Sequence, residues 1–329
     1  MLILNAADVR QALPIDAAID AMRRAFAALS DGRAQVPLRA HLPVPAHGGV
    51  CLVMPALVDD PPEQALAVKV VSLFEHNAQR GLARIQAAVL VVDPQTGRPA
   101  ALLEGAALTA IRTGAASGAA TDLLARPDSC TAAIFGAGVQ ARTQLEAVCT
   151  VRTIRTVWVY DPATEAARAF AGQVAGQGPI PGDVRVAASP QEALAFADVI
   201  CTATTSAVPV FDDADLKPGV HVNAIGSYQP DVQEIPPETV VRALLVVDSR
   251  QAALSETGDL IQPIRQGLIT PEHVHAELGE LVLGRKPGRA RPEQVTLFKA
   301  VGVAVQDAVA ACAALRRAEQ LGLGQQVAW

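Results

Sequence analysis

The sequence holds 329 residues, of which 50% are hydrophobic, and carries a formal net charge of −6 at pH 7. A chain of this length can bury a large core and is expected to form two domains, because domains usually hold about 100–200 residues. The acidic balance and the lack of a basic cluster argue against a nucleic-acid partner. No apolar run reaches the roughly 18 residues of a membrane span, which argues against a membrane protein.

The N-terminal segment and the cysteines predict a cellular compartment. Residues 1–8 show neither a charged segment nor a long apolar core, so no signal peptide is expected. The cysteines are scattered, odd in number and without a C-x-x-C pair, which is typical of a reducing cytoplasm and predicts no metal centre. They are Cys51, Cys130, Cys149, Cys201 and Cys312.

The first hundred residues are predicted to form a helix and a mostly antiparallel sheet. Apolar residues recur at helical spacing from Ile15 to Leu29, and Gly32 follows as a stop. Strands are expected in two pieces over 36–58, at 65–74, at 85–92 and after a turn at 93–97. A helix rich in alanine and glycine over 104–124 leads into the second half.

From Ser129 onward, strands and helices alternate, which predicts a parallel, doubly wound sheet. The strands are expected at 131–136, 154–160, 183–187, 197–203, 219–225 and 243–248. After Gln251 we expect loops and short helices. A final helix over 301–317 is expected to return to the first domain.

A glycine turn follows the strand at 131–136. Gly136, Gly138 and Ala141 give the dinucleotide-binding pattern G-x-G-x-x-A. Gly136 would permit a tight turn, Gly138 would let a pyrophosphate approach the backbone, and Ala141 would let the helix and strand pack closely. The phosphates would bind N–H groups at the N-terminus of the next helix. Asp161 directly follows the next strand, where this fold places a carboxylate for the adenosine ribose.

Two cations lie among apolar or small residues. Lys69 interrupts an apolar strand, so it is either an edge residue pointing to water or a cation that holds a substrate anion or donates a proton. Arg112 is either a helix-surface arginine or a guanidinium fork for a carboxylate or phosphate. On the sequence alone, Arg39 counts as a surface residue.

Small polar residues follow two strands, at Cys201–Ser206 and Asn223–Tyr228. Ligands of an open parallel sheet bind at the carboxyl ends of strands, so these residues fit a nicotinamide and its ribose. Strand-end turns also favour such residues. His273 and His275 have no metal-binding partner and are expected on a solvated helix.

Several motifs follow one another along the chain, and together they resemble the ornithine cyclodeaminase/mu-crystallin family over nearly the full length. They are Lys69-Val-Val-Ser72, Arg80-Gly81, Asp93-x-x-Thr-Gly97, Leu108-Thr-Ala-x-Arg-Thr-Gly-Ala-Ala-Ser117, Gly136-Ala-Gly-Val-Gln140, Asn223-Ala-Ile-Gly-Ser227, Pro230-Asp-x-x-Glu234 and Leu297-Phe-Lys-x-Val-Gly302. The resemblance implies a homodimer. It also implies a substrate-binding and dimerisation domain (1–118 and 301–329) of α+β type, completed by the C-terminal helix. A Rossmann domain (119–300) would hold NAD(H) or NADP(H).

The resemblance also implies the site residues. Arg39, Lys69 and Arg112 match the binders of the substrate carboxylate, with Met54 and Val301 as further substrate contacts and Lys69 and Asp231 as candidate catalytic residues. The cofactor contacts implied are Arg112, Thr113, Gly136, Ala137, Gly138, Val139, Gln140, Asp161, Thr202, Ala203, Thr204, Ala224, Ile225, Gly226 and Ser227.

Three positions depart from the cyclodeaminase pattern. Tyr228 stands where cyclodeaminases carry an aspartate for the amine chemistry, and Asp231 follows three residues later, as in the reductase branch. Leu52 replaces a glutamate two residues before Met54, and Ala300 replaces a frequent serine. The first two changes favour a substrate without a distal ammonium.

These observations predict an NAD(P)H-dependent reductase of a small cyclic ketimine acid. The substrate would be Δ1-pyrroline-2-carboxylate or Δ1-piperideine-2-carboxylate, and the product L-proline or L-pipecolate. The three cations would hold the carboxylate, with the C=N carbon over the nicotinamide. Asp161 favours NADH, since no arginine lies just after it to bind a 2′-phosphate; NADPH stays possible. The alternatives are an ornithine cyclodeaminase, an alanine dehydrogenase and a mu-crystallin-like binding protein.

Overall fold

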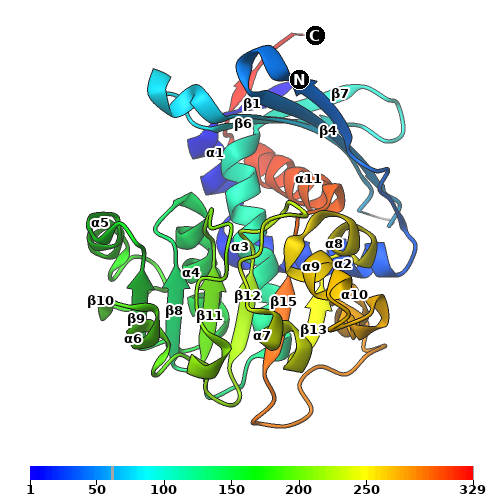
Figure 1. The fold of residues 1–329 in the computed structure, drawn as a ribbon. Coiled ribbons are helices and arrows are strands. Elements are labelled where there is room, and N and C mark those ends of the chain that lie inside the picture. Colours follow the sequence, from blue (N-terminus) through cyan, green and yellow to red (C-terminus); the bar gives the residue numbers. More distant parts are fainter. Residues whose placement is uncertain (61–62, 329) are drawn as a thin grey trace. The chain divides into compact units, whose positions relative to one another are not determined.

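The computed structural model describes residues 1–60 and 63–328 and divides into two compact units (Figure 1). The first unit consists of Met1–Arg112 together with the chain from Val303 onward. The second unit is Thr113–Gly302. No helix in the described part of the chain is long and apolar enough to cross a membrane.

The first unit is built on a curved, mostly antiparallel sheet, as the sequence predicts. Its strand order is β16-β1-β7-β6-β5-β4-β2, with β3 also paired to β4, and the β1–β7 pair is parallel. The strands are β1 (Leu2–Leu4), β2 (Ala34–Gln35), β3 (Ala40–Val44), β4 (Gly49–Val58), β5 (Ala65–Phe74), β6 (Ile85–Val92), β7 (Pro99–Glu104) and β16 (Gln325–Gln326).

The helices of the first unit cover one face of this sheet. They are α1 (Ala6–Ala12), α2 (Ile15–Ser30) and α11 (Ala304–Leu321), with the 3-10 turns η1 (Pro45–His47) and η2 (Glu75–Arg80). Helix α11 packs against α1 and α2 and against β4, β5 and β6, so the C-terminal helix completes this unit. It begins three residues later than the sequence predicts, because Gly302 has a φ of +83°, which a helix cannot accommodate.

Helix α3 (Gly105–Leu124) begins in the first unit and continues into the second, which holds a parallel sheet of order β10-β9-β8-β11-β12-β15-β13-β14. Its strands are β8 (Thr131–Phe135), β9 (Thr156–Tyr160), β10 (Val184–Val186), β11 (Val199–Thr202), β12 (His221–Ala224), β13 (Leu244–Val247), β14 (Ala276–Glu277) and β15 (Thr296–Lys299). Its helices are α4 (Val139–Val151), α5 (Thr164–Val174), α6 (Pro190–Leu194), η3 (Asp213–Asp215), α7 (Pro237–Arg242), α8 (Arg250–Glu256), α9 (Gly258–Arg265), η4 (Pro271–His273) and α10 (Leu278–Val282).

One strand of this sheet corrects the prediction of loops and short helices after Gln251. Strand β15 lies between β12 and β13 and pairs with both in parallel. All four of its residues are buried, including its terminal Thr296 and Lys299. Polar residues at both ends of so short a segment hide the apolar run that marks a buried strand.

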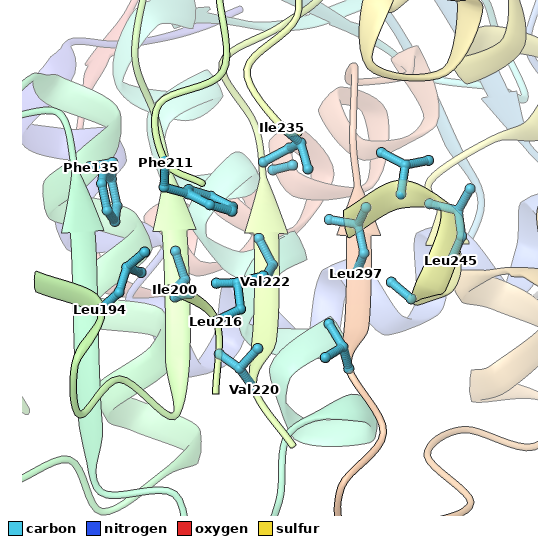
Figure 2. Close-up of a cluster of buried hydrophobic side chains, with 14 of the residues drawn as sticks. Phe135, Leu194, Ile200, Phe211, Leu216, Val220, Val222, Ile235, Leu245 and Leu297 are labelled. Atoms are coloured by element: carbon cyan, nitrogen blue, oxygen red, sulfur yellow. The ribbon is translucent and has the colours of Figure 1, made fainter. Parts of the chain in front are cut away.

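A cluster of apolar side chains anchors one face of the second sheet (Figure 2). Phe135, Ile200, Val222 and Leu297 project from four neighbouring strands, and each is at most 1% exposed. Burying a side chain of this size contributes roughly 1.5–3 kcal/mol. The cluster therefore fixes the strands whose carboxyl ends carry the predicted cofactor contacts.

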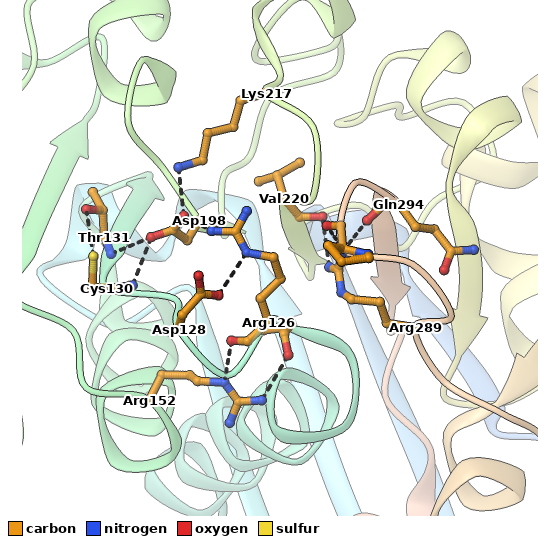
Figure 3. Close-up of polar contacts among 12 residues, drawn as sticks. Arg126, Asp128, Cys130, Thr131, Arg152, Asp198, Lys217, Val220, Arg289 and Gln294 are labelled. Carbon is orange, nitrogen blue, oxygen red and sulfur yellow. Dashed lines mark hydrogen bonds and ion pairs between the residues drawn. The ribbon is translucent and has the colours of Figure 1, made fainter.

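A charged cluster stabilises the amino ends of the same strands (Figure 3). Asp198 accepts hydrogen bonds from the backbone N–H groups of Cys130 (2.8 Å) and Thr131 (3.0 Å) and pairs with Arg126 and Lys217. Arg152 donates to carbonyl groups of Thr121, Asp122 and Ala125 at the C-terminal end of α3, where such groups lack helical partners. These charges therefore serve the fold.

Candidate active site

The glycine turn after β8 has the geometry that the fingerprint predicts. Gly136 has a φ of +97°, and a Cβ atom there would lie 2.7 Å from the carbonyl oxygen of Ala203. Gly138 precedes α4 and supplies no side-chain cap, and a Cβ atom there would meet nothing within 4 Å. The first N–H groups of α4 therefore adjoin open space, as phosphate binding requires.

Asp161 is held beside this turn. Its Oδ2 atom accepts the N–H of Ala137 at 3.0 Å, and its Oδ1 atom accepts the N–H of Ala163 at 2.8 Å. A cavity of about 590 Å³ opens here, and none of the described residues that line it is an arginine or lysine. The lining comprises Phe135, Gly136, Ala137, Gly138, Tyr160, Asp161, Pro162, Pro190, Ala203, Thr204, Thr205, Ser206, Pro209 and Val210.

Two buried polar atoms near these elements support the fit to a dinucleotide. Thr202 Oγ1, at the end of β11, and Gln140 Oε1, in the first turn of α4, have no hydrogen-bond partner among the described residues. Buried polar atoms are nearly always satisfied, so such atoms indicate a missing polar partner. Together with the cavity and the turn, they fit a nicotinamide dinucleotide.

A glutamate that the sequence reasoning left without a role joins the two strand-end loops. Glu234 Oε1 accepts the N–H and the Oγ1–H of Thr204, each at 2.8 Å, and its Oε2 atom accepts the N–H of Gly226, also at 2.8 Å. A Cβ atom on Gly226 would lie 2.4 Å from Glu234 Oε1, so glycine is needed for this approach. Burial raises the pKa of Glu234, and the charge of Lys299 opposes that shift.

A second buried acid supports Glu234. Asp259 Oδ1 accepts the N–H groups of Glu234 (2.6 Å) and Ile235 (3.0 Å), while Asp259 Oδ2 pairs with Lys299 Nζ at 2.8 Å. Lys299 is fully buried at the end of β15. Lys299, which directly follows Leu297 and Phe298, was the one local sequence signal for this network, and it pointed to no buried role because β15 was not recognised.

We expect Glu234→Gln to raise the dissociation constant for NADH about tenfold, since its amide nitrogen cannot accept hydrogen bonds from Gly226 or Thr204. Fluorescence titration with NADH measures the change. Asp198→Asn is the matched control, because Asp198 binds backbone N–H groups at the amino end of β8. That control should lose stability and keep its NADH affinity; a folded Glu234→Gln with wild-type affinity would contradict the prediction.

The two cations of the first unit are buried and share one acid. Lys69 is 2% exposed in β5, and its Nζ atom lies 2.7 Å from Asp307 Oδ2. Arg112, in α3, places its Nε atom 3.1 Å from Asp307 Oδ1 and its Nη1 atom 3.0 Å from Gln306 Oε1. Because β5 lies between β4 and β6, Lys69 is not an edge residue, and Arg112 is not on the surface.

The charges of this cluster determine its protonation. Burial lowers the pKa of Lys69 to about 8, Asp307 acts to raise it, and Arg112 and Arg39 act to lower it. Although burial acts to raise the pKa of Asp307, the charges of Arg112 and Lys69 hold it below its ordinary value. The cluster is therefore an anion, Asp307, between two cations. Asp307 escaped the sequence reasoning, although an acid inside an apolar helix is a visible signal.

The other predicted substrate residues are distributed between the units. Met54 is buried in β4 directly opposite Lys69, and Arg39 precedes β3 and is half-buried. Val301 follows β15 in the second unit and donates its N–H to Asp248 at 2.9 Å. Asp231 is exposed in the loop after β12, where Tyr228 is 41% exposed. Lys69, Arg112 and Met54 thus come together in the first unit, and Asp231 lies in the second.

The remaining predicted cofactor residues belong to the second unit. Thr113, its first residue, is buried in α3. Val139 is 76% exposed at the start of α4. Ala224 ends β12, and Ile225 and Ser227 flank Gly226 in the loop that Glu234 holds.

One unit is an open parallel sheet with this glycine turn, and the other unit buries a cation pair. Together these features define a Rossmann-type oxidoreductase of the kind that uses a nicotinamide dinucleotide. The chain belongs to the ornithine cyclodeaminase/mu-crystallin family, whose model matches residues 1–320. The predicted family and fold class are thereby confirmed.

Individual relatives agree with this assignment. The chain is 40% identical to a Δ1-pyrroline-2-carboxylate reductase of Bacillus cereus over 328 residues, 99% of each chain. It is 40% identical to the ketimine reductase mu-crystallin of Mus musculus over 281 residues, 85% of this chain and 84% of the relative. The structure of Thermococcus litoralis Δ1-pyrroline-2-carboxylate reductase with NADH and L-proline matches with a TM-score of 0.94 and 44% identity, over 99% of this chain and 100% of that one.

An archaeal alanine dehydrogenase dimer with bound NAD matches with a TM-score of 0.92 and 32% identity, over 100% of this chain and 99% of that one. Its dimeric state and its nucleotide match two properties that the sequence predicts for this chain.

Proposed function

We propose that this protein is an NADH-dependent reductase of a small cyclic ketimine acid, with Δ1-pyrroline-2-carboxylate or Δ1-piperideine-2-carboxylate as substrate and L-proline or L-pipecolate as product. The observation that carries the proposal is the buried pair of Lys69 and Arg112, a site for one carboxylate, in a chain whose second unit has a dinucleotide crevice. The names of the relatives favour this chemistry.

The first unit binds and orients the acid. The guanidinium of Arg112 and the ammonium of Lys69 hold the substrate carboxylate, and Arg39 adds positive charge. Lys69, directly or through a water, is also the candidate donor of the proton that the imine nitrogen gains, which makes the imine carbon more electrophilic. The hydride that this carbon gains is the chemistry that bound NADH supplies.

Leu52 and Met54 are buried on the same face of β4. They provide no carboxylate for a distal ammonium, which favours a cyclic ketimine over ornithine. A substrate panel separates the enzymes: ketimine acids with NADH, pyruvate plus ammonia with NADH, and ornithine without reductant. Tight NADPH or aromatic-ligand binding without turnover would instead indicate a binding protein.

The cofactor is proposed to be NADH because Asp161, which lines the cavity, is held in place by two backbone N–H groups. A carboxylate there accepts ribose hydroxyls and repels a 2′-phosphate, and the described lining offers no cation to bind that phosphate. We expect KM for NADPH to exceed KM for NADH by at least about tenfold, roughly 1.4 kcal/mol. Steady-state kinetics with both cofactors measure the ratio, and a preference for NADPH would contradict it.

The protein is proposed to form a homodimer through the face of the first sheet that α11 does not cover. On that face, Val53, Val70 and Ala88 form one cross-strand row, and Pro55, Val68, Leu90 and Leu102 form another. These side chains are apolar and only partly buried, and Val70 is 43% exposed. Exposed apolar patches commonly mark protein–protein interfaces, which favours this face as the subunit contact. The molar mass in solution, measured by light scattering, tests the dimer.

The cytoplasmic location stays a prediction.

A further inference from the structure

We propose that Asp307 is a positioning residue that keeps Lys69 protonated and fixed beside Arg112, so that the cluster receives one carboxylate of the substrate. The inference rests on the proposed function and extends it to a residue that touches neither reactant. Its basis is the geometry of one buried carboxylate that holds both cations.

The two oxygens of Asp307 divide the cations between them. Oδ2 lies 2.7 Å from Lys69 Nζ and Oδ1 lies 3.1 Å from Arg112 Nε, with all three side chains at most 7% exposed. Asp307 is itself anchored by α11, which packs against β4, β5 and β6. The acid therefore fixes the spacing of the two cationic groups. Because both groups are buried, neither can turn outward to be solvated by water instead.

The charge count explains why an acid belongs here. Lys69 and Arg112 contribute two positive charges and Asp307 one negative charge, so the triad carries a net charge of +1. A monoanionic acid neutralises the excess charge of the triad, which a buried site favours, and the nearby charge of Arg39 adds to the attraction. An ammonium has three N–H donors, and Asp307 is the acceptor recorded for Lys69 within the described chain, so two donors remain for a ligand.

The same geometry makes the protonation of Lys69 depend on Asp307. The groups that act on Lys69 are burial, Arg112 from α3 and Arg39 from the segment before β3, all of which oppose its charge, and Asp307 from α11, which supports it. Removing the carboxylate leaves a buried lysine facing two arginines. Its neutral form is then favoured, and it loses both its attraction for a carboxylate and the proton it could donate.

The test uses two nearly isosteric variants with opposite expected directions. The alkaline limb of kcat/KM reports the free enzyme. With a ketimine acid and NADH, the apparent pKa of this limb should fall by at least about one pH unit in Asp307→Asn. An opposite charge at this distance shifts a pKa by about 1–3 units. In Gln306→Glu, a carboxylate placed beside Arg112 should move the limb up. Glu63→Gln is the control. Glu63 is 46% exposed and pairs with Arg316, which lies in α11 as Asp307 does, so this variant should leave the apparent pKa unchanged.

A readout without substrate accompanies the kinetics. The chain has four lysines, Lys69, Lys217, Lys286 and Lys299, so the ¹³Cε signal of Lys69 can be assigned with Lys69→Met and titrated by NMR. Its midpoint should fall in Asp307→Asn and rise in Gln306→Glu. If Asp307→Asn does not fold, Gln306→Glu alone decides the direction.

The outcomes separate the two proposals. If the Lys69 midpoint shifts in the variants but the protein reduces no ketimine, the proposed function is refuted and the role of Asp307 is supported. Ketimine reduction with an unmoved limb and an unmoved Lys69 midpoint in folded variants would keep the function and overturn the role of Asp307.

Discussion

Replacing Lys69 with methionine is expected to lower kcat/KM for the ketimine acid at least about thirtyfold. Methionine keeps much of the apolar stem and removes the ammonium that binds the carboxylate. Truncating one partner of a buried, hydrogen-bonded charge pair costs about 2–5 kcal/mol, and the lower bound corresponds to this factor. Steady-state kinetics at pH 7, below the Lys69 pKa of about 8, measure the loss with the wild-type lysine mostly charged.

The control must show that the loss comes from the site. Lys69→Met leaves Asp307 paired with Arg112, so the variant should fold and bind NADH with wild-type affinity, because the dinucleotide crevice belongs to the second unit. Lys217→Met removes a lysine that pairs with Asp198 in the second unit and should keep its kcat/KM. If kcat/KM of Lys69→Met equalled that of the wild type, Lys69 would have no role in binding or converting the substrate.

Alanine at Gly138 is expected to weaken NADH binding at least about tenfold while leaving the fold intact. The backbone at Gly138 has a φ of −90°, which alanine adopts easily, and its Cβ atom would meet no protein atom within 4 Å. The methyl group would instead fill the space through which a pyrophosphate approaches the backbone. Fluorescence titration with NADH measures the affinity, and thermal denaturation measures the stability.

Gly136 provides the contrasting case. Alanine there must adopt a φ of +97° and place its Cβ atom 2.7 Å from the carbonyl oxygen of Ala203. The backbone strain alone costs about 1–3 kcal/mol. Gly136→Ala should therefore lose both stability and NADH affinity, while Gly172→Ala in α5, where a Cβ atom meets nothing, should lose neither. A Gly138→Ala variant that binds NADH as tightly as the wild type would contradict the placement of the phosphates.

The second unit could be predicted well because the central strands of its sheet are buried on both faces. Such strands appear as short, largely apolar runs, and the predicted strands over 131–136 and 197–203 lie where β8 and β11 are found. Strand β15 was missed because Thr296 and Lys299 occupy its ends. The partners that satisfy Lys299 and His221 come from other segments of the chain, and no local pattern reveals them.

The candidate site divides in the same way. The glycine turn and Asp161 belong to a local motif with fixed spacing, so the sequence indicates them directly. Asp307 pairs with Arg112 across 195 positions of the sequence, and a pairing over that distance follows only from the packing of α11. The sequence could therefore identify the cations as candidates, and the structure was needed to find the acid between them.

Product analysis tests the central claim most directly. The protein is incubated with Δ1-pyrroline-2-carboxylate and NADH, and L-proline and NAD⁺ are quantified together. The account predicts that they form in equal amounts, or that L-pipecolate does so from Δ1-piperideine-2-carboxylate. The account would be contradicted if the protein oxidised NADH with neither ketimine acid and instead released ammonia from ornithine in the absence of added reductant.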